Sequence, residues 1–245
     1  MSKNYESGHA KNLASFDEIT TYVISYGKSY LPPVDGLSLA QLQSKAKSVR
    51  QALDLVNSTN AAYKQALASK EEELQPLKKL TTRVVNLLKI LGLPTAITDE
   101  ADSLNRKMQG RRASQKPNPD TADALKTPAA EKKQISASQQ SADNLIETFD
   151  KLIQLLRTIT TYAPKEEDLT ITSLNDLLGR LKTKNKATDD EYINLVKARA
   201  TRDEQMYAEG TGMVALAMDI KKYIKAAFGA DSTEYKQISG IEFDK

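Results

Sequence analysis

The sequence predicts an all-α protein, an elongated helical bundle built from two pseudo-repeated helical units. Proline and glycine number only 8 and 10 among 245 residues, and they gather between apolar runs. Within those runs apolar side chains recur at steps of three and four, which is typical of amphipathic helices. Part of the pattern occurs twice, because Tyr30 to Leu39 aligns with Tyr162 to Ile171 at a constant offset of 132 residues.

The first helix expected in each unit carries an apolar stripe that would face a core. In the first unit the stripe consists of Leu13, Phe16, Ile19, Val23, Tyr26 and Tyr30. In the second unit it consists of Leu145, Phe149, Leu152, Ile153, Leu156 and Ile159. Each stripe ends at a proline turn, because a residue that precedes proline avoids the helical region.

Two further helices are expected in each unit. Ser38 and Thr170 stand where they can cap the second helix, flanked by hydrophobic staples, Leu37 with Leu42 and Leu169 with Leu174. The third helix is expected to be long. In the first unit it covers about 61–91, and in the second it begins at a capping box of Thr188 and Glu191 and reaches Phe228. These long helices align at an offset of 136, which places Pro76 opposite Gly212 and predicts a kink in each.

The resulting division of the chain has four parts. They are a polar tail over 1–10, helical unit one over 11–110, a flexible polar linker over 111–140 and helical unit two over 141–245. The linker is rich in Ser, Ala, Gln and Lys and contains three prolines, so it cannot bury enough apolar surface to order itself. A short helix closed by glycine is expected near the end of each unit, over 99–108 before Gly110 and over 232–238 before Gly240.

Composition indicates a cytoplasmic protein. The chain has no cysteine, which excludes disulfides and thiolate metal sites and fits a reducing compartment. Its first residues lack the apolar segment of a signal peptide, and no apolar run is long enough to cross a bilayer. We therefore expect no association with a membrane.

The side chains that carry chemistry form no familiar catalytic pattern. The single histidine, His9, lies in the expected polar tail, and the spacings of histidine and glutamate typical of zinc sites are absent. The sequence has no glycine-rich phosphate loop. We expect no catalytic, cofactor-binding or metal-binding residues, and hence a protein that is not an enzyme.

A basic stretch at the end of unit one has two interpretations. It contains Arg106, Lys107, Arg111, Arg112 and Lys116 without an acidic residue between 103 and 116. These cations could contact the phosphates of a nucleic acid or an acidic partner. They could equally complement a helix C-terminus and keep the linker solvated. The stretch has no aromatic side chain on which a single-stranded base could stack.

Small residues gather in the last long helix. Gly210, Gly212, Ala215 and Ala217 would allow a partner helix or a ligand to come close. The alternative is a kink, or tight packing against the other unit, and the pattern alone does not separate these interpretations.

Several segments resemble a family of uncharacterised bacterial all-helical proteins with an internal duplication. They are Thr82 to Leu88, Asn105 to Arg112, Lys221 to Ala230 and Tyr235 to Ile241. The resemblance implies the fold and provides no activity or site to transfer. Together with the missing catalytic patterns, it favours a non-enzymatic cytoplasmic scaffold or protein-interaction module that self-associates, with an unknown protein partner. The alternative is a nucleic-acid-binding protein that uses the basic stretch 106–116.

Overall fold

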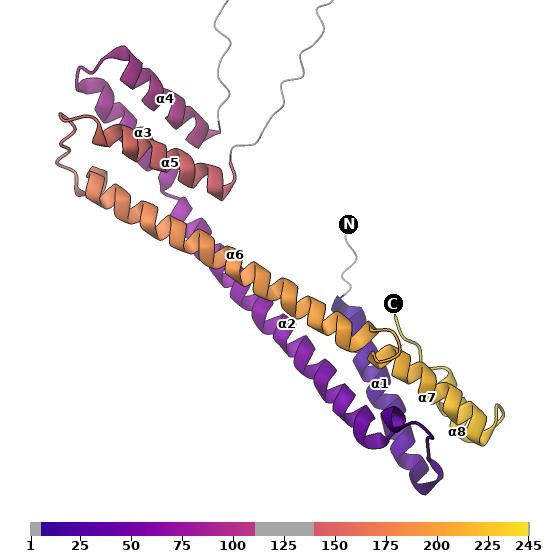
Figure 1. Ribbon diagram of the computed structural model, residues 1–245. Coiled ribbons are helices and arrows are strands. Elements are labelled where there is room, and N and C mark those ends of the chain that lie inside the picture. Colours follow the sequence, from indigo (N-terminus) through magenta and orange to yellow (C-terminus); the bar gives the residue numbers. More distant parts are fainter. Residues whose placement is uncertain (1–5, 111–139, 245) are drawn as a thin grey trace, which may run out of the picture. The chain divides into compact units, whose positions relative to one another are not determined.

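The computed structural model describes residues 6–110 and 140–244, and within them the chain is all-helical, without strands (Figure 1). The expected linker at 111–139 lies outside the described residues. The α-helices are α1 (Glu6–Tyr26), α2 (Leu39–Leu74), α3 (Leu77–Ile90), α4 (Thr95–Gln109), α5 (Ala142–Arg157), α6 (Ile171–Tyr207), α7 (Met213–Phe228) and α8 (Thr233–Ser239). Short 3-10 turns occupy Gly27–Ser29, Asp35–Leu37 and Glu167–Leu169.

Contacts divide the chain into two compact units, and each unit takes segments from both halves of the sequence. The terminal unit comprises Met1–Gln65 and Asp190–Lys245, and the central unit comprises Ala66–Asp189. Helices α2 and α6 therefore each contribute one part to the terminal unit and another to the central unit. This division by contacts differs from the division by sequence repeat, which separates 11–110 from 141–245.

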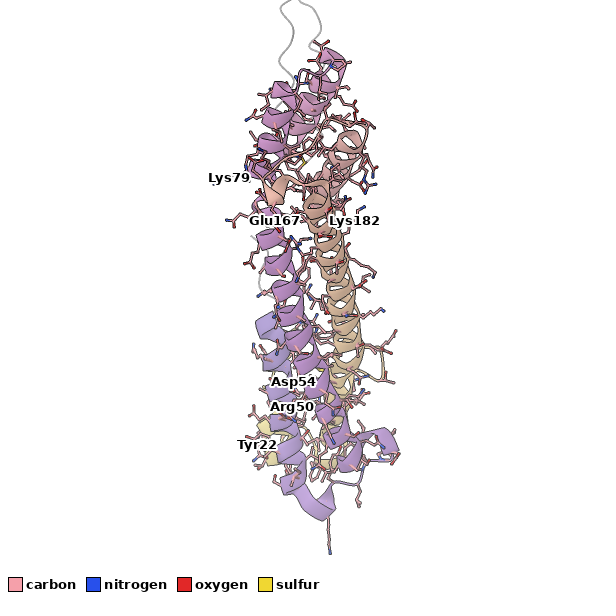
Figure 2. All side chains as sticks on the ribbon, turned by 90° about the vertical axis from the view of Figure 1, so that its left-hand side faces the viewer. Tyr22, Arg50, Asp54, Lys79, Glu167 and Lys182 are labelled. Atoms are coloured by element: carbon pink, nitrogen blue, oxygen red, sulfur yellow. The ribbon has the colours of Figure 1, made fainter. Side chains whose placement is uncertain are left out.

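The terminal unit is built around the stripe expected on the first helix. Phe16 and Ile19 of α1 are fully buried and belong to one core cluster with Leu42 of α2 and Ile220 of α7. At the surface an ion pair joins α1 to α2, with 2.7 Å between Arg50 Nη2 and Asp17 Oδ2. Figure 2 shows Arg50 on the outer side of α2, one turn from the exposed Asp54. The buried apolar stripes hold these helices together, and the charges lie outside them.

The central unit has a core of its own, built from other helices. Phe149 and Leu152 of α5, from the second expected stripe, are buried with Leu174 of α6 and Leu88 of α3. α4 closes the unit through the fully buried Met108. It ends as expected at Gly110, whose φ of 70° is left-handed and whose N–H bonds the carbonyls of the last turn.

The expected long third helices are wrong, and the long helices are instead α2 and α6. Ser58 and Thr59, which resemble a loop, lie inside α2, where both hydroxyls donate to the carbonyl of Leu55. Thr188 does not start a helix, because it lies within α6 and donates to the carbonyls of Lys184 and Ala66 at 2.9 and 3.3 Å. Polar side chains that satisfy themselves on the helix do not interrupt it when its other face is packed.

Helix ends stand where kinks were expected. α2 ends at Leu74, and Pro76 occupies the position before α3. α6 ends at Tyr207, and Gly212 directly precedes α7. Proline lacks a backbone donor and glycine lacks a side chain to pack, so each favours a full break over a bend within one continuous helix.

Candidate functional site

The turns before α2 and before α6 have the same geometry. In each, a buried tyrosine hydroxyl donates to the carbonyl oxygen seven residues later, Tyr30 to Leu37 at 2.7 Å and Tyr162 to Leu169 at 2.8 Å. Burial disfavours the charged phenolate, and it raises the pKa of Tyr30 and of Tyr162 to about 12. These bonds hold the turn in place, and the turn forms one wall of a pocket in each unit.

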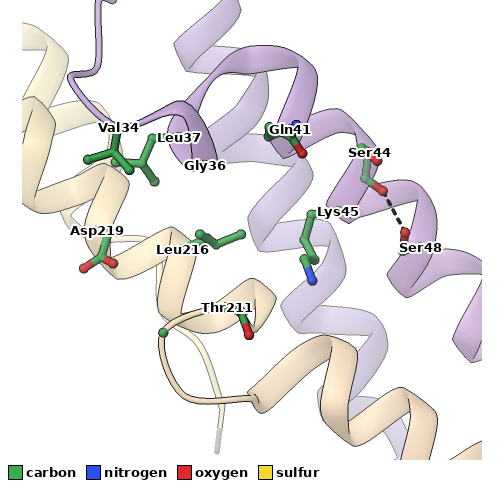
Figure 3. A pocket seen from close by; sticks show the side chains of 11 residues that line it. Val34, Gly36, Leu37, Gln41, Ser44, Lys45, Ser48, Thr211, Leu216 and Asp219 are labelled. Atoms are coloured by element: carbon green, nitrogen blue, oxygen red, sulfur yellow. Dashed lines mark hydrogen bonds between the residues drawn. The ribbon is translucent and has the colours of Figure 1, made fainter.

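The pocket of the terminal unit, here the Lys45 pocket, lies between the start of α2 and the turn that joins α6 to α7 (Figure 3). Its volume is about 610 Å³, within the range of small-molecule sites. Leu37 and Leu216 provide apolar surface, and Lys45 extends from α2 between α2 and α7. Its polar lining further includes Gln41, Ser44, Ser48, Thr211 and Asp219.

The charges of the Lys45 pocket are unequally matched. Lys45 Nζ donates to a neutral acceptor, Gln205 Oε1, at 3.2 Å. The carboxylate of Asp219 is neutralised on its own helix, with 2.9 Å between its Oδ1 and Lys222 Nζ. The side chain of Lys45 is half-buried, so its positive charge is partly removed from water. The pocket therefore presents a cation next to apolar surface, which is the arrangement that binds an amphipathic anion.

The central unit has a pocket at matching positions, here the Asp168 pocket, with a volume of about 510 Å³. The residues that line both pockets at the 132-residue offset are Gly36 and Asp168, Gln41 and Ser173, Ser44 and Asp176, Lys45 and Leu177, and Ser48 and Arg180. Leu80 of α3 lies where Leu216 of α7 lies in the terminal unit. The two pockets thus share their positions and differ in their chemistry.

Two charged residues that line the Asp168 pocket, Asp168 and Arg180, are held in ion pairs. Arg83 of α3 pairs with Asp168 through both of its terminal nitrogens, one of them 3.2 Å from Oδ1. Arg180 of α6 is held by Glu73, with 2.7 Å between Nε and Oε1. The first pair joins α3 to the turn before α6, and the second joins α2 to α6. Asp168 and Arg180, which line this pocket, therefore both have partners of opposite charge.

A second candidate is a stripe of exposed apolar side chains on α6. Leu195 and Ala198 are buried against Val56 of α2, and they form the packed face of this part of the helix. A neighbouring face stays open to solvent. It carries Tyr192, Ile193 and Val196, which are 52%, 49% and 46% exposed. We call these three residues the α6 stripe. Apolar side chains grouped outside the packed face are a common mark of an interaction surface.

A polar cluster joins the beginning of the described chain to its end. The structure differs here from the expected polar tail, because α1 begins at Glu6 and His9 is buried, with its Nδ1 2.7 Å from Tyr207 Oη. Asn12 donates to the carbonyl of Asp244 at 2.7 Å and accepts from the N–H of Asp244 at 2.8 Å. These two hydrogen bonds between the side chain of Asn12 and the backbone of Asp244 dock the C-terminal segment on α1. We therefore interpret the cluster as structural.

The predicted basic stretch is only partly described. Arg106 and Lys107 are exposed in the last turn of α4, whose C-terminus a positive charge stabilises. Arg111, Arg112 and Lys116 lie outside the described residues. The structure therefore places two of the five cations side by side in the last turn of α4. Stabilisation of the helix C-terminus also accounts for their presence there.

The small residues of the candidate close contact lie at and after the α6–α7 turn. Gly210 has a left-handed φ of 72°, and a methyl group there would meet no atom within 4 Å. At Gly212 a methyl carbon would lie 2.5 Å from the backbone nitrogen of Ala208, within its own turn. Ala217 of α7 is fully buried and Ala215 only partly. The close approach at Gly212 is thus local to the turn that borders the Lys45 pocket.

Sequence reasoning missed both candidate sites. The Lys45 pocket combines residues from α2 with residues more than 160 positions later, and no motif connects them. The α6 stripe can be recognised in the sequence, because Tyr192, Ile193 and Val196 are apolar and lie on a different face of the helix from Leu195 and Ala198. The apolar face of this helix is wider than packing against one partner helix requires, and that excess width would have identified the stripe.

Two features are absent from residues 6–110 and 140–244. No group of three or more His, Asp or Glu side chains in these ranges could hold a metal ion. None of the helices there combines the length and the apolar character that a bilayer-crossing segment needs. Comparisons of the chain with protein-family models, with curated proteins and with solved structures found no match.

Proposed function

We propose that the protein is a non-enzymatic cytoplasmic helical scaffold that self-associates through the α6 stripe. The observation that carries this proposal is the exposure of Tyr192, Ile193 and Val196 beside a face that is already packed. Ile193 and Val196 belong to no core cluster of the terminal unit, and the ring of Tyr192 contacts the partly buried Tyr63 with 5.6 Å between the ring centroids. Burial of these side chains against a second copy would remove apolar surface from water, at about 25 cal/mol per Å².

The charges that flank the stripe are self-complementary. Asp190 precedes the stripe by one turn, and Lys197 follows it. When α6 pairs with its copy in the antiparallel sense about the midpoint between Ile193 and Asn194, Asp190 of one copy faces Lys197 of the other on both sides of the two-fold axis. A two-fold contact must match itself in this way, because the same patch is used twice.

Light scattering after size-exclusion chromatography tests the proposal. Wild-type protein should have the mass of a dimer, and Ile193→Glu with Val196→Glu should reduce it to a monomer with an unchanged helical circular-dichroism spectrum. Ile90→Glu is the matched control, because Ile90 is 78% exposed on α3 and outside the stripe. A wild-type protein that stays monomeric over a wide concentration range would contradict self-association.

Charge-reversal variants distinguish this antiparallel geometry from nonspecific association. Lys197→Glu places two acids opposite each other and should weaken the dimer, since like charges across a contact repel. Lys197→Glu combined with Asp190→Lys exchanges the two charges and should restore the dimer. Failure of the double exchange to restore it would show that the helices do not pair in the antiparallel register.

We further propose that the two halves of the chain are pseudo-repeats. Support comes from the matching turns at Tyr30 and Tyr162, the matching helix order around them, and the shared positions of the two pockets. The relation to a bacterial family of duplicated helical proteins rests on the sequence resemblance alone. In this proposal each compact unit takes its turn, before α2 or before α6, from one half of the chain. It takes a helix pair, α7 with α8 or α3 with α4, from the other half.

A further inference from the structure

We propose that the Lys45 pocket binds a small amphipathic carboxylate, a molecule with an apolar body and one carboxylate group. This inference does not rest on self-association, because the pocket and the α6 stripe share no residue. Lys45 would bind the carboxylate. Its ammonium carries three donors, one of which is directed to the neutral Gln205. A carboxylate provides the negative charge that Gln205 lacks.

Hydroxyl groups stand where they can share the same anion. Ser44 directly precedes Lys45 on α2, Ser48 lies about one turn after it, and Thr211 extends from the α6–α7 turn (Figure 3). Ser48 also donates to the carbonyl of Ser44 at 3.1 Å. Hydrogen bonds to an ionised group are stronger than those between neutral groups, so these side chains favour the anion over an uncharged ligand.

The apolar part of the ligand has its own surface. Leu37 is buried at the base of the turn, Leu216 faces the pocket from α7, and Val34 is 58% exposed at the rim. A volume of about 610 Å³ exceeds what a simple anion needs and fits a body of several carbon atoms. The combination excludes a bare inorganic anion as the best-matched ligand.

At the matching positions of the Asp168 pocket, charged side chains form ion pairs. There Arg83 of α3 pairs with Asp168 of the turn. The matching positions of the terminal unit hold Gly36 on the turn and Asp219 on α7, which cannot form this pair. Leu177 stands where Lys45 stands, so the Asp168 pocket also lacks the central cation. In the Asp168 pocket the charged side chains are held in ion pairs, whereas Lys45 of the other pocket donates to a neutral amide.

Titration of the full chain with octanoate, followed by amide NMR shifts, tests the site. The amide chemical shifts of residues around Lys45 and Thr211 should change on addition of octanoate and reach a plateau. 1-Octanol, the uncharged analogue, should bind about tenfold more weakly. Lys45→Gln removes the positive charge, shortens the side chain by only one atom and should remove this difference. Lys47→Gln is the matched control, because Lys47 is exposed on α2 outside the pocket. Equal binding of both ligands by the wild type would overturn the proposal.

A second variant closes the pocket and leaves Lys45 in place. Gly36→Asp with Asp219→Arg recreates the ion pair of the Asp168 pocket, and a methyl carbon at Gly36 would meet no atom within 4 Å. The double variant should lose octanoate binding by about tenfold or more while its helical spectrum is retained. Unchanged affinity in this variant, or octanoate-induced shifts confined to residues outside the Lys45 pocket, would show that the carboxylate binds elsewhere.

Discussion

The hydroxyl of Tyr30 donates to the carbonyl of Leu37 across the turn that leads into α2, at 2.7 Å. Tyr162 and Leu169 repeat the bond before α6. Tyr30→Phe and Tyr162→Phe should each lower the free energy of unfolding by about 1 kcal/mol, and by up to about 3 kcal/mol where the buried carbonyl is left unpaired. Chemical denaturation measures the loss. Tyr192→Phe, at a half-exposed position, is the control and should have little effect.

Alkaline pH should destabilise the fold through buried tyrosines. The pKa of Tyr26, Tyr30 and Tyr162 is raised from 10.0 to about 12, chiefly by burial. A raised pKa means that the folded state holds its protons longer than the unfolded state. Their contribution to stability is therefore complete below pH 10 and is lost as the pH rises from 10 to 12.

Spectrophotometric titration at the tyrosinate band checks this expectation. Native protein should show a group of tyrosines that ionise near pH 12, and unfolded protein in denaturant should titrate near pH 10 as a single population. Tyr30→Phe should remove one equivalent from the late phase. A native titration that matches the unfolded one would contradict the burial of these hydroxyls.

Local patterns predicted the helical class and the buried stripes, because both depend on residues close in sequence. Phe16, Ile19 and Phe149 are buried as the three- and four-residue spacing indicated. Gly110 ends α4 for a reason that is local as well, its left-handed φ. These features need no knowledge of which helix packs against which.

The remaining features depend on contacts between distant segments. Asn57 to Asn60 resemble a loop, and they continue as helix because Val56 packs against Leu195 of α6. The composition of each compact unit, with segments from both halves, follows from such pairings and from no local signal. The Lys45 pocket could not be predicted for the same reason, because Lys45 and Leu216 meet only after the chain has folded.

The turn between α6 and α7 should not tolerate side chains at its glycines. Gly210 has a φ of 72°, where alanine costs roughly 1–2 kcal/mol, and Gly212 has no room beside Ala208. Gly210→Ala and Gly212→Ala should each lower the melting temperature. Gly179→Ala is the control, because Gly179 lies within α6 with open space around it. That change should raise stability by up to about 1 kcal/mol.

The nucleic-acid alternative makes a prediction that is separate from self-association. If the basic stretch binds duplex DNA, affinity should fall steeply with salt, and each lost phosphate contact should reduce the log–log slope by about 0.9. Arg106→Glu with Lys107→Glu should weaken such binding strongly, and further reversal of Arg111 and Arg112 should abolish it. Lys47→Glu with Lys64→Glu changes the charge equally on α2 and should not. A protein that fails to bind at low salt excludes this function.

A chain cut between its two halves should stay together. Each compact unit takes helices from both sides of residues 111–139, so a core such as Phe16 with Ile220, or Leu88 with Phe149, crosses the cut. A protease site introduced at 118–125 would give two fragments that separate under denaturing conditions. Under native conditions they should elute as one particle, with the helical spectrum of the intact chain.

Core substitutions provide the comparison for this experiment. Phe16→Ala removes a fully buried ring from the contact with α7 and costs about 3–5 kcal/mol, so the terminal unit of the cut variant should unfold at a lower denaturant concentration. Tyr192→Ala, outside the core, should not have this effect. If the fragments of the otherwise unaltered chain instead separated as two folded bodies, the compact units would follow the sequence halves 11–110 and 141–245. The pairing of α1 with α7 and of α3 with α5 would then be wrong.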